Sequence, residues 1–221
     1  YKSPGLFLGY FKSPEATAEA LEDGWLLSGD AGYMTERGHL KIIDRAKDVS
    51  RLNDGTLFAP KYIENKLKFS PYIKEAVAHG MEKDFVAVFI DIDYGSVANW
   101  AERRHLAFTS YGDLSQKPQV YDLIHEAICK VNQSLSKDAK LKNSQIRRFL
   151  MFTKELNPDD GEITRTRKIR RKFVANKYRE LIDALYSPGQ DSVVMEIKAT
   201  YEDGRTTDVR ADLKIRDAQA Y

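Results

Sequence analysis

Residues 85–92 read Phe-Val-Ala-Val-Phe-Ile-Asp-Ile, and seven of these eight residues are apolar. Such a run is typical of a strand that is buried on both faces of a sheet. Residues 75–79 form a second strand candidate just before it. Helices are expected after it at 96–105 and 118–135, and the longer one carries apolar residues on one face: Val120, Ile124, Ile128, Val131 and Leu135. The pattern predicts an α/β (α+β) domain whose small sheet, with 85–92 at its centre, is flanked by helices.

The pattern continues toward the C-terminus with another strand at 146–152, a polar loop at 157–161 and a helix over about 167–185. The helix has a buried stripe of five residues: Ile169, Phe173, Tyr178, Leu181 and Leu185. Beyond Ser187-Pro188-Gly189, apolar residues alternate with polar ones on either side of the turn Glu202-Asp203-Gly204: Met195, Ile197, Ala199, Tyr201, Val209, Ala211, Leu213 and Ile215. An antiparallel hairpin over 190–217 is therefore predicted. Its apolar face must dock on the α/β domain or on a second subunit, and the short connection favours the first.

The N-terminal part is predicted to be rich in short strands separated by glycines. Six elements are expected there: a helix over 13–22, strands over 25–27, 32–35 and 40–44, a hairpin of 49–52 with 56–59, and a helix over 60–69. The hairpin turns at Asn53-Asp54-Gly55.

Composition limits the function classes. The chain has 221 residues, and 35 Lys and Arg against 33 Asp and Glu leave a net charge of only +2, which excludes a generally basic nucleic-acid coat. Cys129 is the single cysteine, so an intrachain disulfide and a metal site built on paired cysteines are excluded. A lone thiol favours a reducing compartment such as the cytoplasm. The sequence contains no stretch of about 18 apolar residues, so no membrane span is predicted. The histidines share no ligand spacing and are interpreted as structural, so no metal site is predicted in this chain: His39, His79, His105 and His125.

Two acidic positions are candidates for ligand binding. Asp30 follows Gly29 in a predicted loop, where its carboxylate either accepts hydrogen bonds from a ligand's hydroxyls or bonds its own backbone. The cluster Asp44-Arg45-Ala46-Lys47-Asp48 lies between two β segments, and its alternative interpretation is a solvated linker with weak ion pairs.

A third candidate is the loop that begins at Gly161 and delivers Lys168 to the predicted start of a helix. A cation placed in this way is suited to bind a phosphate or a carboxylate. Six Lys or Arg residues lie between Arg165 and Lys172, so contact with nucleic-acid phosphates is an alternative. A solvated helix face explains this short basic run better, because no aromatic residue other than Phe173 accompanies it.

Several motifs occur in a specific order: Tyr10-Phe11-Lys12-Ser13-Pro14-Glu15, Gly24-Trp25-Leu26-Leu27-Ser28-Gly29-Asp30, Ile42-Ile43-Asp44-Arg45, Lys47-Asp48, Gly55, Pro60-Lys61-Tyr62-Ile63-Glu64 and Gly161-Glu162-Ile163-Thr164-Arg165-Thr166-Arg167-Lys168. Over about residues 9–185 they resemble the AMP-forming acyl-CoA synthetases of the adenylate-forming superfamily, in particular the long-chain fatty acid–CoA ligases. The resemblance implies two steps. A fatty acid carboxylate attacks the α-phosphate of ATP, with Mg²⁺, to give acyl-adenylate and pyrophosphate, and the thiol of coenzyme A then displaces AMP.

The resemblance also implies roles for individual residues. Asp30 and Arg45 match the residues that bind the ribose of AMP or ATP, and Lys168 matches the catalytic lysine that bridges carboxylate and phosphate oxygens during adenylation. Lys47 matches the hinge about which the small C-terminal domain turns. Asn53, Asp54 and Gly55 match the loop beside the coenzyme A channel.

Three residues and one segment depart from the family pattern. Ser28 replaces a threonine, Arg165 replaces a proline, Arg167 replaces an apolar residue, and the hairpin 190–217 lies beyond the usual end of the family. The phosphate loop, the magnesium-binding segment and the acyl tunnel have no counterpart in this sequence. We therefore expect the C-terminal part of a longer enzyme, inactive by itself.

The resemblance implies three parts: an edge of the large adenylating domain at 1–46, a mobile lid domain with a small mixed sheet at 47–186, and the hairpin extension at 187–221. The expected partners are a fatty acid, ATP and coenzyme A, with no nucleic acid. Peripheral membrane contact, a homo-oligomer and the length of the acyl chain stay open. The alternative is a free-standing, lid-like binding or regulatory module without catalysis.

Overall fold

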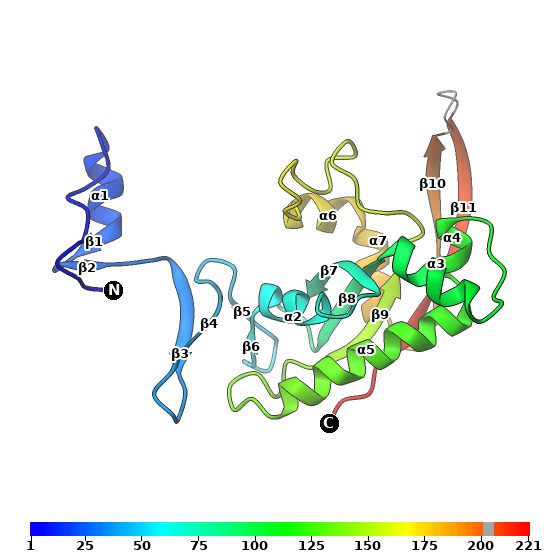
Figure 1. Cartoon of the computed structure of the whole chain (residues 1–221), viewed down its shortest axis with the longest axis horizontal. Coiled ribbons are helices and arrows are strands. Elements are labelled where there is room, and N and C mark those ends of the chain that lie inside the picture. Colours follow the sequence, from blue (N-terminus) through cyan, green and yellow to red (C-terminus); the bar gives the residue numbers. More distant parts are fainter. Residues whose placement is uncertain (201–205) are drawn as a thin grey trace. The chain divides into compact units, whose positions relative to one another are not determined.

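A computed structural model describes residues 1–200 and 206–221, and residues 197–200 and 206–209 are described by their backbone alone (Figure 1). The chain forms two compact units, Tyr1–Ser50 and Arg51–Tyr221. The predicted turn Glu202-Asp203-Gly204 and the predicted apolar position Tyr201 lie outside the described residues.

The first unit consists of one short helix and two small antiparallel sheets. Helix α1 (Pro14–Ala20) leads into β1 (Leu21–Glu22), which pairs with β2 (Trp25–Leu26). Strand β3 (Asp30–Met34) pairs with β4 (Leu40–Arg45). The helix is therefore shorter than expected, because the residues from Leu21 onward pair as a strand.

The predicted loop position of Asp30 is wrong, because Asp30 is the first residue of β3 and stands opposite Arg45 in the register. The amide of Ala46 also donates to the carbonyl of Gly29 at 2.8 Å, which extends the pairing beyond the strands. Gly32 permits this close pairing, since a Cβ atom there would meet the carbonyl oxygen of Lys41 at 2.7 Å.

The second unit is built on a five-stranded mixed sheet with the order β10-β11-β9-β8-β7. Its strands are β7 (Ile73–His79), β8 (Val86–Ile92), β9 (Ile146–Met151), β10 (Ser192–Thr200) and β11 (Thr206–Asp217). Only β8 and β9 run parallel, and the other neighbours are antiparallel. Strand β8 is buried at every position, as its apolar run predicts. It is an inner strand, but β9 is the middle one, because the hairpin adds two strands beyond β9.

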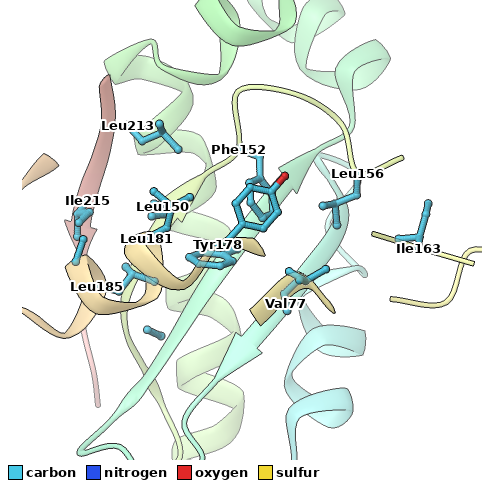
Figure 2. Packing of buried hydrophobic residues seen from close by; sticks show 14 residues of the cluster. Val77, Leu150, Phe152, Leu156, Ile163, Tyr178, Leu181, Leu185, Leu213 and Ile215 are labelled. Carbon is cyan, nitrogen blue, oxygen red and sulfur yellow. The ribbon is translucent and has the colours of Figure 1, made fainter. Parts of the chain in front are cut away.

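Helices cover both faces of this sheet. They are α2 (Pro60–Leu67), α3 (Tyr94–Glu102), α4 (Tyr111–Ser115), α5 (Pro118–Ser136), α6 (Arg171–Lys177) and α7 (Arg179–Tyr186). Phe149 of β9 contacts Tyr121 of α5, with ring centroids 5.7 Å apart. The next residue, Leu150, points to the opposite face, where it packs in a cluster with residues of α6 and α7 (Figure 2). The predicted fold class, a small mixed sheet flanked by helices, is confirmed.

The helix predicted over 60–69 ends at Leu67, and the helices predicted over 96–105 and 167–185 differ more strongly from the prediction. Helix α3 begins at Tyr94 because Asp93 caps it, accepting a hydrogen bond from the amide of Ser96 at 2.9 Å. The single helix expected over 167–185 is two helices, which begin only at Arg171 and break at Tyr178 (φ −109°, ψ 29°). Lys168 therefore lies in a loop and not at the start of a helix.

The C-terminal hairpin docks on the α/β sheet of its own chain, as the short connection predicts. Residues Ile215, Arg216 and Asp217 of β11 pair with β9. Leu213 and Ile215 are only 1% and 6% exposed, and Figure 2 shows them in the same cluster as Leu150 and the leucines of α7. Val193, Met195 and Ala211 pack against that cluster as partly buried residues. In the described part of the chain, no helix has the length and apolar character needed to cross a membrane.

Candidate functional site

The loop that presents Lys168 is closed by backbone hydrogen bonds. The Arg170 amide donates to the Glu162 carbonyl at 2.9 Å, and Ile163 and Ile169 form an antiparallel bridge. The Thr164 amide donates to the Lys168 carbonyl at 2.8 Å, while the Lys168 amide donates to the Thr164 hydroxyl at 3.0 Å. Residues 162–170 thus form a small hairpin, and both backbone polar groups of Lys168 are used within it.

The side chain of Lys168, by contrast, is exposed. Its ammonium group forms neither a hydrogen bond nor an ion pair with any residue that the structure describes. Arg167, just before it, has the left-handed backbone angle φ 57° that turns the chain at this point. The result is a cation without a partner among the described residues, on a loop with a fixed backbone, which is an arrangement suited to bind an anionic ligand.

A buried carboxylate, Glu162, lies at the base of this loop. Lys154 contacts both of its oxygens at 3.0 and 2.9 Å, and Lys177 contacts one at 2.7 Å. Tyr178 donates its hydroxyl hydrogen to Glu162, and the Asn157 amide donates at 2.9 Å. Burial raises the pKa of Glu162, but the hydrogen bonds from Lys177, Tyr178 and Lys154 outweigh burial, so the pKa lies below its ordinary value.

Two other residues of the basic run, Arg170 and Arg171, have contacts within the fold. Arg171 binds the carboxylate of Glu64 through two nitrogens, at 2.7 and 2.9 Å. Arg170 donates to the carbonyl of Gly161 at 3.1 Å. These contacts explain part of the charge without a nucleic-acid partner.

Asp30 and Arg45 are brought together in the first unit. Their side chains form an ion pair of 3.0 Å across β3 and β4, and they are 32% and 56% exposed. Arg45 also donates to the Ser28 carbonyl at 3.1 Å. Both groups are accessible, and the ion pair fixes the carboxylate at the end of a strand.

Lys47 lies in the turn that follows β4, and it is exposed. The Arg45 carbonyl accepts hydrogen bonds from the amides of Asp48 at 2.9 Å and Val49 at 3.2 Å, which define this turn. The turn stands three residues before the boundary between the two compact units, after Ser50.

Asn53, Asp54 and Gly55 form the turn between β5 (Ser50–Arg51) and β6 (Leu57–Phe58). The Asp54 carboxylate accepts from the amide of Thr56 at 2.8 Å, and this backbone hydrogen bond lowers the pKa of Asp54. Gly55 has φ 82°, which favours glycine. Asn53 donates its side-chain amide to Asp84 at 2.7 Å, so this turn is held by a different part of the second unit from the Lys168 loop.

The predicted site residues fall into three groups: Asp30 with Arg45 and the following Lys47 turn in the first unit, and the Asn53–Gly55 turn and the Lys168 loop in the second. Glu162 stands in the motif quoted above, but no local pattern marks it as a buried carboxylate, because most of its partners are distant in sequence. Among the described residues, no three His, Cys, Asp or Glu side chains group in a way that could hold a metal ion.

The family model of the AMP-binding enzyme C-terminal domain matches residues 47–190. The chain belongs to this family. The match spans the Asn53–Gly55 turn, strands β7, β8 and β9 and the Lys168 loop, and it confirms the family that the ordered motifs predict. This AMP-binding enzyme C-terminal domain is joined in our chain to the strands of residues 1–46 and to most of the C-terminal hairpin.

Two curated relatives of this chain are named long-chain-fatty-acid–CoA ligases, the group that the ordered motifs resemble. The chain is 34% identical over 183 residues to the long-chain-fatty-acid–CoA ligase FadD15 of Mycobacterium tuberculosis. This match covers 82% of this chain and 30% of the relative. It is 36% identical over 189 residues to long-chain-fatty-acid–CoA ligase 1 of Cavia porcellus, covering 84% of this chain and 26% of the relative. The chain thus spans less than a third of the length of these relatives.

A solved structure with the same fold is the adenylation domain of a carboxylate reductase from Mycobacterium chelonae. The TM-score is 0.57 at 24% sequence identity, and the match covers 84% of this chain and 27% of that chain. At this identity the likeness concerns the fold.

Proposed function

We propose that this chain is the C-terminal part of an ATP-dependent, AMP-forming acid–thiol ligase that activates a long-chain fatty acid and transfers it to coenzyme A. The observation that carries the proposal is Lys168, an exposed cation without a described partner on a backbone-fixed loop, within a family of AMP-binding enzymes. The relatives named above are long-chain-fatty-acid–CoA ligases, which supports this acid as the substrate.

In the first step, a carboxylate oxygen of the fatty acid forms a bond to the α-phosphorus of ATP, and the bond to pyrophosphate breaks. Negative charge accumulates on the phosphate oxygens as this happens. The Lys168 ammonium stabilises that charge electrostatically and transfers no proton. In the second step, the sulfur of coenzyme A bonds to the acyl carbon, and AMP leaves.

Asp30 and Arg45 would hold the ribose of the nucleotide. An ionised carboxylate offers about four acceptor positions, so Asp30 can keep the 3.0 Å ion pair with Arg45 and still accept from two neighbouring hydroxyls. Mg²⁺ would bind together with ATP, and the resemblance to the acyl-CoA synthetases implies that its binding segment belongs to the longer protein.

We propose a boundary between residues 46 and 47, with Lys47 as the hinge and Asn53, Asp54 and Gly55 beside the coenzyme A channel. The family match begins at residue 47, and the compact units divide after Ser50, which supports this position. The lid domain would extend to residue 186, and the 187–221 extension shares its sheet. The unpaired thiol of Cys129 supports a cytoplasmic location.

The test uses the full-length protein that contains this chain. Exchange of radiolabel between pyrophosphate and ATP should depend on a long-chain fatty acid. Lys168→Ala should slow this exchange by about 10²- to 10³-fold, the cost of losing one well-placed transition-state donor, and should spare thioester formation from supplied acyl-adenylate.

Lys172→Ala is the matched control, because Lys172 is exposed and belongs to the same basic run. It should leave both half-reactions unchanged. Absence of acid-dependent exchange in the wild-type protein would overturn the proposed function and favour a binding or regulatory module. Equal damage to both half-reactions by Lys168→Ala would remove Lys168 from the proposed role.

A further inference from the structure

The side chain of Glu162 is fully buried, six residues before the exposed Lys168. Burial of a carboxylate is costly unless it is paired and hydrogen-bonded. Here the carboxylate receives five contacts, from Lys154 on both oxygens, from Lys177, from Tyr178 and from the Asn157 amide. Its acceptor positions are therefore saturated by the protein.

The partners of Glu162 come from both sides of the loop. Lys154 and Asn157 precede it, whereas Lys177 and Tyr178 stand at the end of α6, after the loop has returned. One carboxylate therefore connects the entry of the loop with the helix that follows its exit. Gly161 makes the approach possible, with φ 75° and with Arg170 and Phe173 atoms 3.2 Å from where a Cβ would stand.

An unbroken series of contacts leads from this carboxylate to Lys168. Glu162 bonds Arg170 through its carbonyl, Ile163 bridges Ile169, and Thr164 bonds Lys168 twice. The two arms of the loop are thus paired at each step from Glu162 to the lysine. A change in the position of Glu162 shifts the backbone that carries the Lys168 ammonium.

The charges around Glu162 are also balanced. Lys154 pairs with both Glu162 and Asp160, at 2.9 and 2.5 Å, and Lys177 pairs with Glu162 at 2.7 Å. Two lysines near the loop are in this way neutralised by two carboxylates. The ammonium of Lys168 stays available for an anionic substrate, while its two lysine neighbours are held by the protein.

We infer that Glu162 is a positioning residue for adenylation, whose buried ion-pair cluster with Lys154, Lys177 and Tyr178 fixes the Lys168 loop in the geometry that the first half-reaction requires. This inference rests on the proposed function. It predicts an effect on the half-reaction that uses Lys168 and none on the other.

The first variant is Glu162→Gln in the full-length protein, which keeps the shape and removes the charge. Adenylation should slow by roughly 10- to 100-fold, as expected for a misplacement on the order of 1 Å. Thioester formation from supplied acyl-adenylate should be unchanged. Glu64→Gln is the matched control, since Glu64 is also a buried carboxylate paired with an arginine but lies outside the loop. It should leave the ratio of the two half-reaction rates at the wild-type value.

The double variant Glu162→Gln with Lys168→Ala separates positioning from a general structural role. If Glu162 acts through Lys168, the double variant is as slow in adenylation as Lys168→Ala alone, because coupled residues are not additive. Multiplied losses in the double variant, or equal loss of both half-reactions in Glu162→Gln, would overturn the inference.

Removing the charge of a buried, paired carboxylate can prevent folding, so Tyr178→Phe provides a milder second variant. It deletes one hydrogen bond to Glu162 and leaves both lysines paired. It should slow adenylation severalfold and spare thioester formation, and a wild-type rate in both half-reactions would count against the inference. Wild-type protein without acid-dependent exchange would instead refute the proposed function itself, so the two failures are distinguishable.

Discussion

Asp91 provides a prediction about the pH dependence of stability. This residue of β8 is only 1% exposed, and its carboxyl accepts hydrogen bonds from the Tyr111 hydroxyl at 2.7 Å and the Leu156 amide at 3.1 Å. Burial raises the pKa of Asp91 from 3.8 to about 6, more than these hydrogen bonds lower it. The perturbation is Asp91→Asn, which removes the titration and keeps a polar group of the same size.

The sign follows from the two pKa values. Between pH 4 and 6 the unfolded chain has already lost the Asp91 proton, whereas the folded protein retains it. The stabilisation from Asp91 is therefore complete below pH 4 and is lost as the pH rises through 6. One pKa unit corresponds to about 1.4 kcal/mol, so the difference between 3.8 and about 6 corresponds to about 3 kcal/mol. The free energy of unfolding of Asp91→Asn, minus that of the wild type, should rise by about this amount between pH 4 and 7.

His79 should give the opposite slope in the same pH range. Burial lowers the pKa of His79 from 6.5 to about 3, with further lowering by Arg171 and Lys83. The unfolded chain then binds the extra proton, so stabilisation from His79 is present above pH 6.5 and is lost as the pH falls. For His79→Leu, the same difference in unfolding free energy should fall by about 3 kcal/mol between pH 4 and 6.5.

Urea unfolding of the 221-residue chain, followed by far-ultraviolet circular dichroism at each half pH unit from 4 to 7, measures both differences. Subtracting the wild-type curve cancels the groups that the substitutions do not change. Parallel curves for wild type and Asp91→Asn would refute the reasoning about Asp91, and slopes of the same sign for the two variants would refute the opposed signs.

Three further outcomes are expected. The 221-residue chain alone should release no pyrophosphate from ATP and a fatty acid, because half a site cannot position the reactants; measurable release would contradict this. In the full-length protein, Lys47→Pro should impair thioester formation more than adenylation, since proline fixes φ near −65° and restricts the residue before it, and unchanged rates in both half-reactions would place the pivot elsewhere. Leu213→Ala should lower the free energy of unfolding, measured in urea, by about 2–5 kcal/mol. Val194→Ala, at a residue that is 44% exposed, should lower it by less than about 0.5 kcal/mol. Equal losses in the two variants would mean that the hairpin is not part of the core.

The fold was predictable where local sequence determines it. The apolar run of β8 and the one-sided pattern of α5 specify buried elements directly. The break at Tyr178 was not predictable from the stripe of apolar residues, because Tyr178 directs its hydroxyl to Glu162, which is distant in sequence. The middle place of β9 depends likewise on a hairpin that pairs with it from more than 60 residues away.

The candidate site shows the same division. The Lys168 loop was predictable because its motif is continuous, and the ion pair of Asp30 with Arg45 was not, because the strand register that joins them is a tertiary property. Glu162 was missed since nothing in a Gly-Glu-Ile sequence indicates that the carboxylate is buried and saturated. Contacts between segments, and not residue types, determine what that side chain does.

The pairing of β11 with β9 also has a consequence for solubility. Without the hairpin, β9 would be an edge strand with unpaired amide and carbonyl groups along one side, and such edges recruit strands of other molecules. The C-terminal segment moves the outer edge to β10, which carries the exposed, charged Glu196. Truncation before residue 190 is therefore expected to increase aggregation through β9, which light scattering of the truncated and the complete 221-residue chain would measure.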